Sequence, residues 1–154
     1  MGTICGICIS EKKGTQKHVV SEAELIEDWG VRLDAHAGKW HRQVSLLGLE
    51  QIDAFRARGA DVAFGDFGEN LIVSGYRVNT LPVGTRLRAG KTAVLEITQI
   101  GKQCHDRCAI YREMGDCIMP REGVFARVLR GGTICPGDEI TVLAGDGGEA
   151  SAQP

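Results

Sequence analysis

The stretch AVLEITQI, residues 93–100, decides the fold class. It is short, apolar and rich in β-branched residues, which is typical of a β-strand. Apolar and polar residues do not alternate cleanly along it, since Val94 and Glu96 share one face. We therefore expect both faces of this strand to be partly covered.

Segments of the same kind recur along the chain, separated by clusters of Gly, Pro and Asp. The expected strands are residues 3–9, 44–47, 70–74, 86–88, 93–100, 125–129 and 140–143. Glycine is abundant, at 21 residues, and aromatic residues make up only 5%, which favours a turn-rich β protein over a helix bundle. Because open sheet edges invite pairing with other chains, this pattern predicts a mostly β fold that forms a closed or nearly closed barrel.

Two helices are expected between these strands. Leu49, Ile52 and Phe55 recur at helical spacing, and Gly59 ends that pattern. Ser21 and Glu24 have the spacing of a capping box, which predicts a second, short helix that carries Trp29 and stops at Gly30.

The length of 154 residues suits one compact domain. We place this domain at residues 3–144 and expect residues 145–154, which are small and polar, to form a mobile tail. A net charge of -2 gives no electrostatic reason to expect a nucleic acid or an anionic membrane as partner. No apolar run approaches the roughly 18 residues that a spanning helix needs, and the N-terminus lacks the basic stretch of a secretory signal. We expect a cytoplasmic protein with reduced thiols.

The segment GKQCHDRCAI, residues 101–110, holds the strongest candidate for a reactive group. Lys102, His105 and Arg107 surround Cys104, and nearby cations favour the thiolate form of a cysteine. Cys104 is therefore a candidate nucleophile at the end of a strand; the alternative is an incidental cysteine in a solvated turn. Cys108 can be a resolving thiol, a metal ligand or a core residue.

The other cysteines favour packing over chemistry. Cys5 and Cys8 could join Cys104 and Cys108 in a zinc site, but they stand in an apolar strand, where residues three apart are expected on opposite faces. Free cysteines of this kind are usually buried. Cys117 and Cys135 lie in mixed apolar stretches and are also expected to pack.

Three polar stretches are candidates for binding. In residues 33–43, Asp34, His36 and His41 can act as ligands, or can shape an anion pocket with Lys39 and Arg42, or can belong to an ordinary polar loop. In GDFGEN, Glu69 and Asn70 precede a strand and can fix neighbouring loops. In MPREG, Arg121 can bind a carboxylate or phosphate, or can form a surface pair with Glu122.

Taken in order, these stretches resemble the MOSC domain, the C-terminal domain type of molybdenum cofactor sulfurases, and in particular the short stand-alone MOSC proteins of bacteria. The resemblance runs from about residue 4 to residue 142. Its pieces are ICISEKKGT, DAHAGKWHRQVSLL, GDFGENL, LPVGTRLRAG, ITQIGKQCH, GDCIMPREGVFARVLRGG and PGDEI. The family's sulfur-carrying cysteine matches Cys104, and Cys108 resembles a second cysteine of the narrower subgroup. The family tends to place Gly before the Asp of its D-x-H element, where this chain has Leu33.

The resemblance implies a barrel-like β fold and a role in sulfur handling or binding of the molybdenum cofactor. Cys104 would carry sulfur as a persulfide, with a cysteine desulfurase as donor and a molybdoenzyme or cofactor carrier as acceptor. The alternative is a module that binds or hands over the cofactor without chemistry. Pyridoxal phosphate is not expected on this chain. The residues predicted to contact the cofactor are Asp34, His36, Arg42, Glu69, Asn70, Lys102, His105, Arg107 and Arg121, and no metal ligands are expected unless Cys104 and Cys108 bind zinc.

Overall fold

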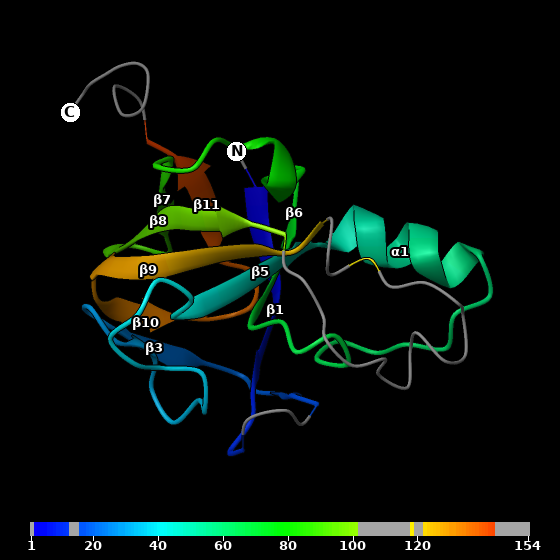
Figure 1. The fold of residues 1–154 in the computed structure, drawn as a ribbon, viewed down its shortest axis with the longest axis horizontal. Coiled ribbons are helices and arrows are strands. Elements are labelled where there is room, and N and C mark those ends of the chain that lie inside the picture. The colour runs from blue at the N-terminus through cyan, green and yellow to red at the C-terminus, as the bar shows by residue number, and fades with distance from the viewer. Residues whose placement is uncertain (1, 13–15, 102–117, 119–121, 144–154) are drawn as a thin grey trace.

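Seven strands close into a β-barrel in the computed structural model, which describes residues 2–12, 16–101, 118 and 122–143. Around the ring, neighbouring strands are β1 (Gly2–Ile9), β6 (Leu71–Ser74), β5 (Val44–Gly48), β9 (Val124–Arg130), β8 (Ala93–Ile100), β7 (Arg86–Ala89) and β11 (Glu139–Val142). The pairing of Gly2 with Ile140 and of Thr3 with Glu139 joins β1 to β11 and closes the ring (Figure 1). The predicted mostly β, closed barrel is confirmed.

The barrel interior is filled by one side of each strand. Along β8, Ala93, Leu95 and Ile97 are buried in the central apolar cluster, whereas the residues between them are half-buried. Both faces of this strand are thus covered to some extent, as its sequence predicts. Antiparallel pairing with β7 on one side and β9 on the other satisfies its backbone.

A helix outside the barrel supports a second apolar cluster. The pairing of β5 with β6 is parallel, and α1 (Leu49–Ala57) makes the crossover between them (Figure 1). Ile52 and Phe55 pack from α1 against Leu47, Ile72 and the buried thiol of Cys8. This helix is the one predicted from the spacing of its apolar residues. No helix within the described residues is both long enough and apolar enough to cross a lipid bilayer.

The prediction of a short helix between Ser21 and Gly30 is wrong. This segment forms a hairpin of β3 (Ala23–Ile26) and β4 (Gly30–Val31), and β3 pairs with β10 (Gly132–Ile134), a strand that the sequence analysis missed. The hairpin turns through residues 27–29, with Asp28 at φ 53°. Leu25 enters the barrel core from β3, so long-range pairing and burial outweigh the local capping pattern. A further two-residue strand, β2 (His18–Val19), pairs with the end of β1.

A β-bulge in β1 corrects the expectation for its two cysteines. The register against β6 shifts between Ile4 and Gly6, so Cys5 and Cys8 both face the outer cluster although they are three residues apart. Burial raises the pKa of the Cys8 thiol to about 12, with a smaller contribution from the negative charge of Glu69. Cys8 is therefore a neutral packing residue at physiological pH, as expected.

Glu69 fixes the tight turn of residues 65–68. Its side chain is fully buried, and its two carboxylate oxygens accept the backbone N–H groups of Gly65 at 3.0 Å and Phe67 at 3.1 Å. Gly65 has φ 94°, and a Cβ there would lie 2.1 Å from the carbonyl oxygen of Lys17. Burial raises the pKa of Glu69 to about 7, although the backbone hydrogen bonds act in the opposite direction.

Leu33 adopts the left-handed backbone conformation that favours glycine. Its φ is 71°, and its side chain is 74% exposed. A residue with a Cβ is strained in this region, whereas glycine is not. The conformation expected of the family's glycine before the D-x-H element is thus kept by a leucine in this chain.

The raised pKa of Glu69 gives a testable pH dependence. Its folded pKa of about 7 lies above the ordinary value of 4.5, so the folded state binds the proton more tightly than the unfolded state. The resulting stabilisation is complete below pH 4.5 and is lost as pH rises toward 7, at a cost of roughly 3 kcal/mol. In urea titrations from pH 5 to pH 8, the free energy of unfolding should fall with pH more steeply in the wild type than in Glu69→Gln. Equal slopes would contradict this assignment.

The strain at Leu33 gives a second prediction. Leu33→Gly should raise the free energy of unfolding by about 0.5–1 kcal/mol, because relief of the left-handed strain exceeds the entropy cost of glycine. Leu33→Ala is the matched control: it removes the same exposed side chain but keeps the Cβ, so it should change stability by less than about 0.5 kcal/mol. Urea unfolding at pH 7 distinguishes the two, and equal effects of the two substitutions would show that the backbone is not strained.

Candidate functional site

A small pocket lies where the start of β9 meets the loops that precede β5 and β6. Its cavity volume is about 30 Å³. The lining residues are His36, Arg42, Ser45, Phe67, Gly68, Asn70 and Phe125. Three of the residues predicted from sequence, His36, Arg42 and Asn70, therefore come together in one place.

A buried ion pair contacts His36, one of the pocket-lining residues. The ammonium of Lys17 lies 2.7 Å from Asp34 Oδ1, and both side chains are completely shielded from solvent. Asp34 Oδ1 also accepts the backbone N–H of Ser10 at 3.0 Å, and Oδ2 accepts the backbone N–H of His36 at 3.2 Å. A buried charge is tolerated when it is paired and fully hydrogen-bonded in this way. Asp34 therefore contributes to the pocket by holding the loop that carries His36.

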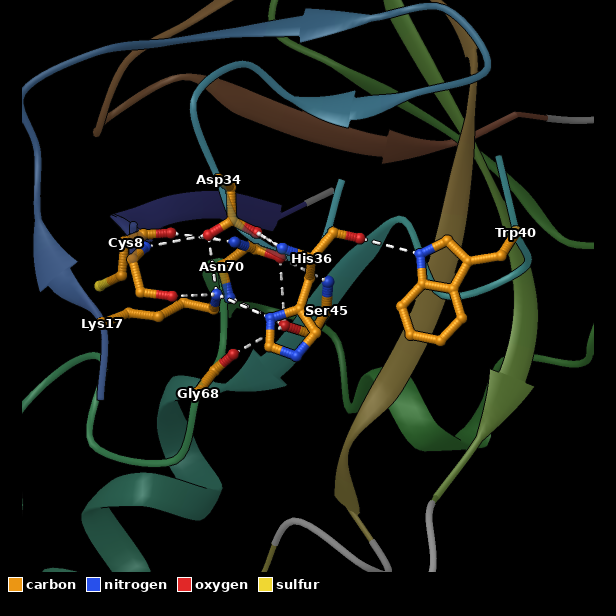
Figure 2. Close-up of polar contacts among 9 residues, drawn as sticks. Cys8, Lys17, Asp34, His36, Trp40, Ser45, Gly68 and Asn70 are labelled. Atoms are coloured by element: carbon orange, nitrogen blue, oxygen red, sulfur yellow. Dashed lines mark hydrogen bonds and ion pairs between the residues drawn. The ribbon is translucent and has the colours of Figure 1, made fainter. Parts of the chain in front are cut away.

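His36 is oriented at both its ring and its backbone. Its Nδ1 lies 3.1 Å from the Lys17 ammonium, and its carbonyl oxygen accepts the indole N–H of Trp40 at 2.8 Å. The rings of His36 and Trp40 are nearly parallel, with centroids 6.5 Å apart. Figure 2 shows Lys17 between the Asp34 carboxylate and the imidazole of His36.

Asn70 lies directly before β6, and its side chain forms hydrogen bonds with β5 and β1. Its side-chain oxygen accepts the backbone N–H of Ser45 at 2.9 Å, and its amide nitrogen donates to the carbonyl oxygen of Cys8 at 3.0 Å. The hydroxyl of Ser45 accepts the backbone N–H of Asn70 at 3.0 Å and donates to the carbonyl oxygen of Gly68 at 3.1 Å. The expectation that Glu69 and Asn70 fix neighbouring loops agrees with these contacts. Glu69 does so from outside the pocket lining.

Arg42 brings positive charge into the pocket without a carboxylate partner among the described residues. Its guanidinium carbon lies 4.8 Å from the ring centroid of Trp40 and 5.4 Å from that of Phe125, so two aromatic faces hold the cation. Its Nε is buried and has no hydrogen-bond partner in the described part of the chain. A buried donor without a partner is costly, so this N–H is suited to an anionic ligand.

The other predicted residues lie apart from the pocket or outside the described residues. His41 does not line the pocket, and its Nε2 lies 2.8 Å from the side-chain oxygen of Gln99 on β8. Glu122 pairs with Arg77, at 2.8 Å, and this contact raises the pKa of Arg77. Lys102, Cys104, His105, Arg107, Cys108, Cys117 and Arg121 lie outside the described residues, as do residues 145–154. Among the residues that are described, no three His, Cys, Asp or Glu side chains gather in a way that could hold a metal ion.

The sequence analysis missed Ser45, Phe67, Gly68 and Phe125 of the pocket lining, and also the supporting residues Lys17 and Ser10. Lys17 is 4% exposed although it follows a polar loop with further lysines. No local pattern distinguishes a lysine that becomes buried from one that stays in solvent. Only the fold brings it against Asp34, which is 17 positions away in the chain.

Comparison with known proteins identifies the family. A model of the MOSC domain matches residues 33–141. No curated protein matches the sequence. Among solved structures, the chain is similar to the YuaD protein of Bacillus subtilis, with a TM-score of 0.75 and 19% identity over 92% of this chain and 96% of that one.

Two further structures share the fold. YiiM of Geobacillus stearothermophilus gives a TM-score of 0.72 and 20% identity over 98% of this chain and 80% of that one. YiiM of Escherichia coli gives 0.65 and 16% over 94% and 70%. The family match covers most of the chain and includes the loop of Asp34, His36 and Arg42. The chain therefore belongs to the MOSC domain family, which is associated with the molybdenum cofactor.

Proposed function

We propose that this protein binds an anionic group of the molybdenum cofactor in the pocket of His36, Arg42 and Asn70, and that it transfers sulfur through a persulfide on Cys104. The observation that carries the binding part is the environment of Arg42. Its cation is held by two aromatic rings, and its buried Nε has no hydrogen-bond partner among the described residues. An oxyanion would satisfy this N–H and balance the charge at once.

The surrounding groups suit the same ligand. His36 adds an imidazole that contacts Lys17. Asn70 holds Ser45 on β5, whose hydroxyl donates to Gly68 in the loop before β6. Phe67 and Phe125 provide apolar surface beside these polar groups. Binding sites for small ligands commonly combine apolar walls with a few placed polar atoms. An organic cofactor with a phosphate suits such a site, because its rings can pack on the apolar walls and its phosphate can accept hydrogen bonds from the polar atoms.

The proposed sulfur step uses Cys104, which follows Gly101 by three positions in the sequence. Gly101 is the residue that directly follows β8. On β8, Gln99 pairs with Phe125, which lines the pocket. The Cys104 thiolate would attack the outer sulfur of a persulfide on a cysteine desulfurase. A new S–S bond would form on Cys104, and the donor cysteine would leave as a thiolate. Lys102, Arg107 and Arg121 are proposed to favour the anionic sulfur, and the acceptor is proposed to be a molybdoenzyme or a cofactor carrier.

Binding without chemistry is the second candidate, and the pocket favours it directly. It requires only Arg42, His36 and their supports, all of which are described. It predicts that cofactor affinity survives Cys104→Ser and that no sulfur moves when donors are supplied.

The binding proposal is tested at Arg42. Arg42→Met keeps the aliphatic stem between Trp40 and Phe125 but removes the charge and the N–H groups. A hydrogen bond to a charged group contributes roughly 1.5–3 kcal/mol, so affinity for the purified cofactor should fall about tenfold or more. Arg130→Met, at the exposed far end of β9, is the matched control and should leave affinity unchanged. If fluorescence titration gave Arg42→Met and the wild type the same affinity for the cofactor, the binding proposal would be refuted.

The sulfur step is tested by mass spectrometry of the protein and of its proteolytic peptides after incubation with a cysteine desulfurase and cysteine. The wild type should gain one sulfur atom on the peptide that contains Cys104. Cys104→Ser should lose this adduct, whereas Cys135→Ser, which removes another free thiol, should keep it. An unmodified Cys104 in a protein that still binds the cofactor would leave the binding module as the function.

A further inference from the structure

Lys17 occupies an unusual place for a lysine, because its ammonium is buried among side chains from separate segments. It lies 3.1 Å from the hydroxyl oxygen of Ser10 at the end of β1, 2.7 Å from Asp34 Oδ1 and 3.1 Å from His36 Nδ1 (Figure 2). The contact with Asp34 is an ion pair between an ammonium and a carboxylate. An ammonium has three N–H donors and no acceptor. Each of its three donors therefore has one acceptor.

This count determines the protonation of the imidazole. Because Lys17 can only donate, Nδ1 of His36 has to accept, and the proton of the neutral ring then lies on Nε2. The oxygens of Asp34 accept from Ser10, Lys17 and the backbone of His36, whereas Nδ1 of His36 contacts the Lys17 ammonium. A proton added at Nδ1 would meet the Lys17 ammonium directly.

Independent contacts hold the backbone of His36 in place. The backbone N–H of His36 donates to Asp34 Oδ2, and its carbonyl oxygen accepts from Trp40. The indole of Trp40 also lies parallel to the ring, at an interplanar angle of 8°. Nδ1 contacts Lys17, and His36 lines the pocket together with Arg42.

We infer that Lys17 is a positioning residue that holds His36, which lines the pocket beside Arg42, in the neutral Nε2–H tautomer. This inference deepens the proposed function, on which its relevance to the cofactor rests. It assigns to Lys17 a role that acts through His36, with no contact to the ligand required.

The tautomer is measured directly by long-range proton–nitrogen correlation spectra of the ¹⁵N-labelled full chain at pH 7.5. His36→Asn assigns the cross-peaks of His36 among the four histidines. We expect the wild type to show the pattern of a proton on Nε2 alone. In Lys17→Met this single pattern should be lost in favour of a mixture of tautomers. Lys91→Met, at an exposed turn, should leave it intact.

Lys17→Met leaves Asp34 as an uncompensated buried charge and can prevent folding. The double variant Lys17→Met/Asp34→Asn removes both charges and keeps the inference open to test, with the same expected loss of the single pattern. A proton on Nδ1 in the wild type would overturn the inference, as would an unchanged Nε2–H pattern in a folded Lys17 variant. Because the spectra need no cofactor, an Nε2–H tautomer in a protein that fails to bind the cofactor would refute the proposed function alone.

Discussion

The buried ion pair of Lys17 and Asp34 is the interaction on which the candidate site depends. It connects the segment before β2, the end of β1 and the loop that precedes β5. Neither charge is exposed, so each would be costly without the other. The pair therefore fixes the His36 loop in one arrangement against the closed barrel. The barrel itself contributes a rigid frame, because the pairing of β1 with β11 leaves no free edge in the ring.

The barrel could be predicted because its signals are local. The apolar residues of β8 and α1 carry their own periods, and the pattern of short strands excludes a helical bundle. The hairpin at residues 23–31 could not be predicted in this way. Its capping pattern at Ser21 and Glu24 is a genuine local preference, but Leu25 gains a place in the core only as a strand paired with β10. The bulge in β1 likewise depends on the register against β6, which no single segment contains.

The site residues that stand in a dense polar stretch of the sequence could be predicted. A residue whose role depends on being buried by the fold could not. Asp34, His36 and Arg42 stand together in a polar stretch that resembles a family motif, and the fold keeps them together. Lys17 stands after other lysines, and its sequence context resembles a solvated loop. Its burial arises from the approach of Gly65, whose carbonyl oxygen accepts the backbone N–H of Lys17 at 2.9 Å. That approach requires the turn held by Glu69, so a residue more than 50 positions away positions the missed lysine.

Lys17 and Arg42, the two cations near the pocket, have different surroundings, and this difference bears on the ligand proposed for the pocket. Lys17 is neutralised by Asp34 and uses its donors inside the protein. Arg42 is held by the faces of Trp40 and Phe125, which orient a guanidinium without satisfying its N–H groups. A carboxylate in that position would compete with an incoming anion, whereas an aromatic face does not. The charge of Lys17 thus stabilises the site through Asp34, whereas the charge of Arg42 is balanced by no carboxylate among the described residues.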